Sequence, residues 1–315
     1  MGLSKISLRT FFRNLYNLFA YDYHELNVER RWQWVELRNY ATMEKMLRFL
    51  EEEGSGPYRD ELAFICRYGV QTFPYAQLKH LETVESGYDA RLKMPFVLHK
   101  GKKLFFPQDV SKDKAEWYYH NFIERENLLG GNYMEKMPHC YQSEQFKVND
   151  GDVFVDVGAA EGLVALDVID KVSKVIIIES DKRWIKALRA TFEPYKDKCV
   201  IIPKLVTNCN GKKTITLDRL LENETDRPIF VKMDIEGYEK TVLEAAKGFL
   251  SKHDIIKLAC CTYHAEHDAQ TIVSIFEQIG YHHEFSDGWM LFSDYDKSLL
   301  NPPFFRHGVI RAWKQ

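Results

Sequence analysis

The stretch DVFVDVGAAEG, residues 152–162, decides the fold of this chain. It starts as a run of apolar and β-branched residues, which predicts a buried strand, and it ends in a glycine-containing turn that enters an apolar helical pattern. Gly158 and Gly162 let the backbone approach a ligand at the carboxyl end of this strand, where open α/β sheets bind their ligands. The stretch therefore predicts the first strand and the ligand loop of an α/β sheet.

Strand and helix patterns alternate on the C-terminal side of this stretch. The runs KVIIIE, CVIIP, PIFVKMD and DIIKLACC are separated by helical patterns such as DKRWIKALRATF and EKTVLEAAKGFL. Such alternation predicts a parallel sheet covered by helices on both faces. We therefore expect an α/β fold with a doubly wound, mostly parallel sheet.

On the N-terminal side the pattern is different. Helical periodicity occupies residues 32–53, about 60–68 and about 75–85, and PFVLHKGKKLFFP predicts a hairpin of strands 96–99 and 103–106. Ser111 or Asp113 can cap the helix that follows. We predict a mainly helical accessory domain with a β-hairpin at residues 1–112 and an α/β domain at residues 113–315.

The spacing of the glycines separates two classes of ligand. A dinucleotide site needs G-x-G-x-x-G to hold a pyrophosphate, whereas Gly158 and Gly162 are four residues apart. Asp156 and Glu161 would repel a pyrophosphate, but they suit a ligand that carries an ammonium and a sulfonium. S-adenosylmethionine carries both charges, so we predict it as the cofactor and do not expect an NAD-dependent dehydrogenase.

A second acid supports a nucleoside ligand. Glu179 ends the second strand pattern, 23 residues after Asp156. In this topology an acid about 20 residues after the first turn accepts hydrogen bonds from ribose hydroxyls. A glycine turn alone is weak evidence, but the turn together with Glu179 predicts a ribose site.

Three segments, in this order, resemble the FkbM-type methyltransferases: VFVDVGAAEG, TLDRLL at residues 216–221, and FVKMDIEGYEKTVLEAAKGFL at residues 230–250. Further similarity lies in MPHCYQSEQF, in Tyr263 and His264 followed by Asp268, and in the closing GVIRAW, so that it covers about residues 118–313. The chain departs from the family at Ala160, where Asn is usual, and at Ser180, where Pro is often found after the acid.

The resemblance implies a class I methyltransferase fold with an antiparallel strand near the C-terminus. It also implies S-adenosylmethionine binding and, usually, methylation of a hydroxyl on a sugar or another small metabolite. By this analogy Asp156, Gly158, Ala159 and Gly162 belong to the loop on the methionine side, and Glu179 binds the ribose.

Asp234 and Glu236 follow the fourth strand pattern, PIFVKMD. In the doubly wound order this strand lies beside the first, so both acids are expected to face the same crevice as Asp156 and to bind the cofactor. The alternative is a structural role, in which they cap the helix that begins at Tyr238 and favour its dipole.

Transfer to a hydroxyl needs a base close to the methyl group. His264 is the first candidate, because an unperturbed histidine titrates near neutrality, and Asp234 is the second. A core or surface histidine is an equally good interpretation of His264. A metal site of His264, His267, Asp268 and Asp234 lacks a diagnostic spacing, so we predict no metal.

Composition narrows the partners and the compartment. The 43 Lys and Arg residues nearly balance 46 Asp and Glu residues, which argues against broad nucleic-acid binding. The six cysteines include no C-x-x-C pair, which favours a reducing, cytoplasmic environment. Polar residues interrupt the apolar positions of residues 1–21, so we predict no transmembrane segment.

The predicted function is therefore S-adenosylmethionine-dependent O-methylation of a small-molecule or glycan acceptor. The alternative is a non-catalytic module that keeps the fold for binding or interaction. Whether the chain forms a homo-oligomer stays open at this stage.

Overall fold

The computed structural model describes residues 44–46, 48–49, 56–68, 71–75, 83–131, 136–265, 267–291 and 304–314. The chain divides into two compact units. One comprises Met1–Pro74 and Leu291–Phe305, and the other comprises Tyr75–Met290 and Arg306–Gln315. The two units are described separately below.

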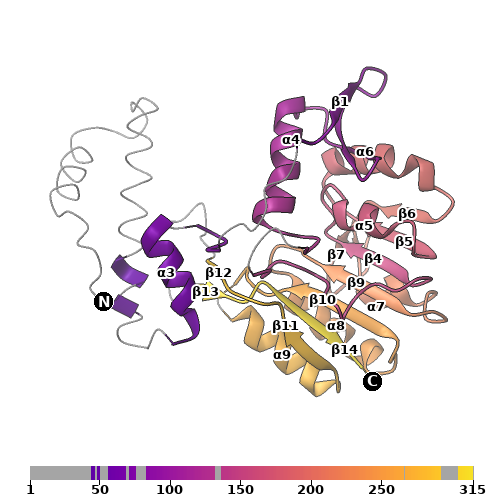
Figure 1. Ribbon diagram of the computed structural model, residues 1–315. Helices are drawn as coiled ribbons and strands as arrows, with labels where there is room; N and C mark the ends of the chain where they lie inside the picture. Colours follow the sequence, from indigo (N-terminus) through magenta and orange to yellow (C-terminus); the bar gives the residue numbers. More distant parts are fainter. Residues whose placement is uncertain are drawn as a thin grey trace. The chain divides into compact units, whose positions relative to one another are not determined.

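The larger unit contains a seven-stranded sheet in the order β11-β14-β10-β9-β4-β5-β6 (Figure 1). Its strands are β4 (Val153–Val157), β5 (Lys174–Ile178), β6 (Cys199–Ile202), β9 (Ile229–Met233), β10 (Ile256–Cys261), β11 (His282–Phe285) and β14 (Val309–Trp313). Strands β6, β5, β4, β9 and β10 pair in parallel, whereas β14 pairs antiparallel with both β10 and β11. This arrangement confirms the predicted fold, including the antiparallel strand near the C-terminus.

Helices cover this sheet because its central strands are apolar on both sides. All residues of β4 and β9 are buried. The helices of the sheet are α5 (Leu163–Val168), α6 (Lys182–Phe192), α7 (Leu217–Leu221), α8 (Glu239–Leu250) and α9 (Asp268–Gln278). Apolar residues of α7, α8 and α9 share one core with the alternate β4 residues Val153, Val155 and Val157. Asp156 therefore points to the opposite face of the sheet, because successive strand residues alternate.

A three-stranded antiparallel sheet also belongs to the larger unit. It consists of β1 (Ser86–Asp89), β2 (Met94–His99) and β3 (Lys102–Phe105), and it is followed by α4 (Lys112–His120) and the π-helical turn η3 (Asn121–Arg125). The predicted hairpin is confirmed as β2 and β3. Lys100 and Gly101 have φ values of 49° and 79°, as a two-residue hairpin turn requires. Ser111 caps α4 by accepting a hydrogen bond from the Lys114 amide.

The hairpin packs on a helix of the larger unit. Met94 and Phe105 share a core cluster with Ala187 of α6, and the Phe105 amide donates to Thr191 Oγ1 at 2.9 Å. The division into compact units accordingly falls near residue 75, whereas the sequence places the domain boundary after residue 112. The periodicity of a hairpin shows which face is apolar but not which element covers it.

The smaller unit contains η2 (Gly56–Tyr58) and α3 (Arg59–Tyr68), which confirms the helix predicted at about 60–68. The Tyr58 ring stacks on Phe305 at 4.8 Å between centroids. Residues 44–46 and 48–49 are helical, whereas the rest of the predicted helix 32–53, residues 1–21 and most of 75–85 lie outside the described residues. Within the described part of the chain, no helix is long and apolar enough to cross a membrane.

Candidate cofactor site

The loop after β4 approaches the loop after β9 very closely. Gly158 has a φ of +76°, and a Cβ atom there would lie 1.8 Å from the carbonyl oxygen of Asp234. The Gly158 amide donates to the Ile178 carbonyl at 3.0 Å, which ties the loop to the end of β5. Only glycine combines this backbone conformation with this approach, so Gly158 shapes the carboxyl edge of the sheet.

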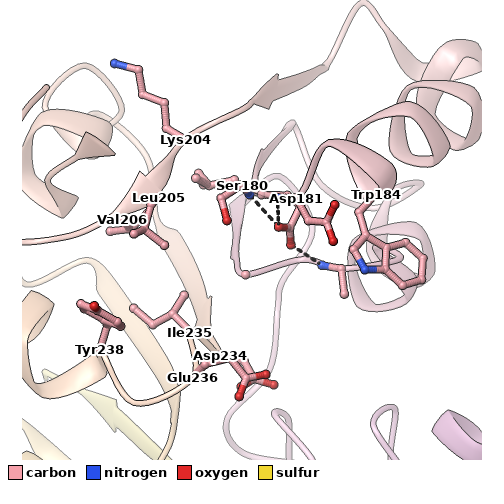
Figure 2. A pocket seen from close by; sticks show the side chains of 14 residues that line it. Ser180, Asp181, Trp184, Lys204, Leu205, Val206, Asp234, Ile235, Glu236 and Tyr238 are labelled. Atoms are coloured by element: carbon pink, nitrogen blue, oxygen red, sulfur yellow. Dashed lines mark hydrogen bonds between the residues drawn. The ribbon is translucent and has the colours of Figure 1, made fainter. Parts of the chain in front are cut away.

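A cavity of about 420 Å³ lies at this edge. In Figure 2 the residues after β5 and those after β6 lie on opposite sides of it, and the loop after β9 closes the lower part of the view. Its lining residues come from the end of β5, from β7 (Leu205–Val206), from the loops after β4, β5, β6 and β9, and from the start of α6: Gly158, Ala160, Ile178, Glu179, Ser180, Asp181, Trp184, Lys204, Leu205, Val206, Asp234, Ile235, Glu236 and Tyr238. The cavity thus lies where the sequence predicted a ligand.

Glu179 is held firmly in the cavity wall by backbone donors. Its Oε2 accepts from the Ala160 amide at 2.9 Å, and its Oε1 accepts from the amides of Ser180 and Asp181 at 2.6 and 2.7 Å (Figure 2). A carboxylate offers about four acceptor positions, so these three bonds leave room for a hydroxyl donor. The geometry is compatible with the predicted ribose contact.

Asp156 does not line the cavity. Register places it opposite Lys232 on the neighbouring strand, and the Lys232 ammonium lies 3.0 Å from Asp156 Oδ1 and donates to the Gly158 carbonyl at 2.6 Å. Burial raises the pKa of Asp156, and the charge of Lys232 opposes that shift. Asp156 therefore supports the Gly158 loop from inside the fold.

Ala159, Glu161 and Gly162 of the first loop do not line the cavity either. Ala159 is buried, and Gly162 begins α5 at a φ of +79°, where a Cβ would come within 2.7 Å of Leu188. Glu161 is buried, and burial raises the pKa of its carboxyl to about 8. Of the loop residues predicted to bind the cofactor, only Gly158 lines the cavity. Ala160, which is not among the predicted cofactor residues, also lines it.

Asp234 lines the cavity as a charged carboxylate. The Tyr141 hydroxyl donates to its Oδ2 at 3.1 Å, and Nε2 of His264 lies 3.4 Å from its Oδ1. Burial by itself would raise the pKa of Asp234, but hydrogen bonding with His139 and the charges of Lys232 and both histidines hold that pKa well below its usual range. Asp234 consequently stays negative at the edge of the cavity.

His264 lies behind Asp234 and outside the cavity wall. Its Nε2 is 3.6 Å from Glu236 Oε2, and its Nδ1 is 3.3 Å from Glu239 Oε1. Burial would lower the pKa of His264, but the adjoining carboxylates of Glu239, Asp234 and Glu236 raise it above the usual value. The imidazole therefore holds a proton more tightly than a free histidine, which suits a charge partner better than a base.

The acids after β9 do not cap α8 with their side chains. Tyr238 occupies the capping position of α8 without a side-chain capping bond, and Glu239 Oε1 instead accepts from the Ile235 amide at 2.7 Å. Glu236, with a side chain 92% exposed, lies at the cavity rim. Asp268 begins α9 and pairs with Lys240 at 3.2 Å, so it does not join His264 and Asp234.

Four residues around the cavity were not predicted from the sequence: His139, Tyr141, Lys232 and Glu239. His139 and Tyr141 belong to MPHCYQSEQF, and Lys232 and Glu239 belong to FVKMDIEGYEKTVLEAAKGFL. Both segments carry the family resemblance, which by itself gives these four residues no role. The sequence predicts that β4 and β9 are neighbours, but it does not give their register. It is this register that places Asp156 beside Lys232. His139 lies 95 residues from Asp234 along the chain, and no local pattern signals that contact.

Comparisons with known proteins identify a family. The sequence signature described as the FkbM methyltransferase domain matches residues 121–299. No curated protein is detectably similar in sequence. An FkbM methyltransferase structure from Methylobacillus flagellatus KT is 21% identical with a TM-score of 0.43, and the similarity covers 54% of this chain and 46% of that chain, which is less than half of its length.

Two further structures belong to other methyltransferases. Precorrin-6y C5,15-methyltransferase from Geobacter metallireducens GS-15 is 13% identical with a TM-score of 0.36, over 54% of this chain and 83% of that chain. A putative tRNA methyltransferase from Streptococcus pneumoniae, solved in complex with S-adenosyl-L-methionine, is 11% identical with a TM-score of 0.35, over 53% of this chain and 68% of that chain.

The signature match spans more than half of the chain and includes the loop after β4 and the acids after β9. The chain therefore belongs to the FkbM family of methyltransferases.

Proposed function

We propose that this protein transfers the methyl group of S-adenosylmethionine to a hydroxyl of a small polar acceptor, such as a sugar or a glycan precursor. The observation that carries the proposal is the cavity of about 420 Å³ at the carboxyl ends of β4, β5 and β9, with Glu179, Asp234 and Glu236 in its wall. Its size suits a nucleoside-sized ligand. Its acids suit one that carries positive charge.

Different parts of the cavity wall suit different parts of the cofactor. Glu179 accepts from the ribose hydroxyls, while Ile178, Trp184 and Leu205 offer apolar surface for the adenine. The Gly158 loop and the Asp234 carboxylate face the methionine portion. Lys204 also lines the cavity. Its ammonium donates a hydrogen bond to the Gly211 carbonyl at 3.1 Å, so its positive charge is partly engaged there.

The cofactor supplies an electrophilic methyl group on a positively charged sulfur. The acceptor oxygen forms a bond to this carbon as the carbon–sulfur bond breaks, and the hydroxyl proton must leave. Of the two predicted catalytic residues, Asp234 lines the cavity and His264 does not. We therefore assign Asp234 to accept a hydrogen bond from the hydroxyl and orient it, while the proton leaves to water, and His264 to position Asp234.

One experiment tests both parts of this proposal. Calorimetry measures binding of S-adenosylmethionine and of its demethylated product, and release of that product is followed with a panel of sugars and nucleotide sugars. Glu179→Ala is expected to weaken binding by about 10- to 100-fold, because it removes a charged hydrogen-bond acceptor. Glu193→Ala, an exposed change in the turn η4 (Glu193–Tyr195), is the matched control and should bind normally.

Asp234→Asn separates binding from chemistry in the same assay. The amide is nearly isosteric but removes one negative charge from the cavity wall, so cofactor binding should weaken by up to about 10-fold. Loss of the charged acceptor that orients the hydroxyl should lower turnover by about 100-fold or more. Full turnover by Asp234→Asn would remove it from the catalytic role. Absence of any affinity of the wild-type protein for either nucleoside would refute the proposed function.

A further inference from the structure

Four polar atoms meet beneath the cavity, where Asp234 contacts a segment that the methyl-transfer proposal does not use. Tyr141 Oη lies 3.2 Å from His139 Nε2, 3.1 Å from Asp234 Oδ2 and 3.7 Å from Cys261 Sγ. His139 Nε2 lies 3.7 Å from both Asp234 Oδ2 and Cys261 Sγ. These distances describe five edges of a small tetrahedron.

The edges have the lengths that a tetrahedral metal site requires. Zinc binds nitrogen and oxygen at about 2.0–2.1 Å and sulfur at about 2.3 Å, which places neighbouring ligand atoms about 3.3–3.6 Å apart. The measured contacts of 3.1–3.7 Å lie within a few tenths of an ångström of these values. The ligand atoms of His139, Asp234 and Cys261 also lie within 4.8 Å of one another.

The chemistry of the donors points to the class of ion. An imidazole nitrogen, a thiolate and a carboxylate form a mixed donor set that suits zinc rather than magnesium or calcium. One thiolate and one carboxylate balance the two positive charges of Zn²⁺, so the buried group would carry no net charge. This matters because His139, Tyr141 and Cys261 are at most 4% exposed.

The surroundings supply a supporting shell and a route of entry. Glu126 Oε2 lies 3.6 Å from His139 Nδ1, on the side away from the cluster, where a carboxylate commonly orients a metal-binding imidazole once the two atoms approach to hydrogen-bond distance. Asp234 is 20% exposed and lines the cavity, so an ion can reach the cluster from that side.

We propose that His139, Asp234 and Cys261 bind one Zn²⁺ ion, with Tyr141 Oη at the fourth corner. The ion would hold Asp234 in place at the edge of the cavity. This site differs from the set considered from the sequence, because His264 directs its two nitrogens at different carboxylates and Asp268 pairs with Lys240.

Cobalt titration of the purified, metal-stripped protein tests the proposal. Binding of Co²⁺ should saturate at one equivalent, produce the near-ultraviolet charge-transfer band of a thiolate ligand and the visible bands of a tetrahedral ion, and be reversed by Zn²⁺. Cys261→Ala should abolish the charge-transfer band and weaken binding by more than about 100-fold, because the single thiolate ligand is lost.

Cys260→Ala is the matched control, since Cys260 is equally buried on the same strand but points into the opposite core. It should keep the band and the affinity. His139→Gln provides a second ligand variant, which should also lose tight binding if Cys261→Ala does not fold. Failure of the folded wild-type protein to bind Co²⁺ or Zn²⁺ more tightly than about 1 μM, or unchanged binding in a ligand variant, overturns the proposal.

Cofactor binding by the metal-stripped protein is measured in parallel. The zinc site and the cofactor site can then fail separately. Normal nucleoside affinity without metal binding rejects only the zinc proposal, and metal binding without nucleoside affinity rejects only the proposed function.

Discussion

Glu161 is a carboxyl group that lies inside the first loop rather than in the cavity. From the sequence, Glu161 and Asp156 are expected to face the positive charges of the cofactor. In the fold, Asp156 pairs with Lys232 and burial raises the pKa of Glu161 to about 8. At the scale of single residues, the negative charges that reach the cavity therefore come from Glu179, Asp181, Asp234 and Glu236.

Glu161→Gln is expected to stabilise the protein in a way that depends on pH. The folded pKa of about 8 lies above the ordinary value of 4.5, so the folded chain keeps a proton that the unfolded chain releases. Wild-type stability should thus decline from about pH 4.5 to about pH 8, and a glutamine avoids this loss. A raised carboxyl pKa costs about 1.4 kcal/mol for each pH unit between its unfolded and folded values, so the variant should gain up to a few kcal/mol.

Chemical denaturation across this pH range measures the gain. The difference in unfolding free energy between variant and wild type should grow with pH and become constant above about pH 8. A difference that is independent of pH would contradict the buried, protonated state of Glu161.

At the scale of elements, the start of α5 depends on close packing against α6. Gly162 lies at a φ of +79°, and a Cβ there would be 2.7 Å from Leu188 and 3.0 Å from Phe192. The sequence predicts this glycine only as part of the cofactor loop. The structure gives it a second role, because it lets the first turn of α5 lie directly on the apolar side of α6.

Gly162→Ala is expected to lower the unfolding free energy by about 2–4 kcal/mol, from left-handed backbone strain and overpacking. Gly248→Ala is the matched control, because Gly248 lies on the exposed side of α8 with nothing within 4 Å of a Cβ. That change should raise stability by about 0.5–1 kcal/mol. Equal effects of the two substitutions in urea denaturation would show that packing at Gly162 does not matter.

At the scale of the larger unit, the three-stranded sheet is tied to the seven-stranded one. His99 on β2 contacts Asp167 Oδ1 on α5 at 2.9 Å through Nε2, and Lys100 pairs with the same carboxylate at 2.5 Å. Burial would raise the pKa of Asp167, but the bonds from His99 and Lys100 lower it to about 2. This ion pair therefore stabilises the packing of segments 67 and 68 residues apart.

Asp167→Asn should cost about 2 kcal/mol at neutral pH. Because the folded pKa is depressed, the stabilisation is present above the ordinary value of 3.8 and is lost as pH falls toward about 2. Asp170→Asn is the control, since Asp170 pairs with Lys102 but is 69% exposed and should change stability little. An equal change in melting temperature for the two variants would show that the contacts of Asp167 with His99 and Lys100 are not what stabilises the protein.

Local patterns in the sequence are enough to specify the core elements and the edge of the sheet where the cavity lies. The apolar runs and their lengths specify strands β4, β5, β6, β9 and β10, and the alternation with helices specifies a parallel sheet. Gly158 and Glu179 were predictable because each lies directly after a strand, so that local position also places it at the cavity.

Long-range packing, in contrast, sets which side chains face the cavity and which lie behind its wall. Asp156 follows the same local logic as Glu179, yet strand register pairs it with Lys232 of β9. His139, Tyr141 and Cys261 meet Asp234 because separate segments converge, and the hairpin joins the larger unit because α6 covers its apolar face. Periodicity reports the apolar face of an element, but the partner of that face depends on contacts between distant segments that one-dimensional spacing does not contain.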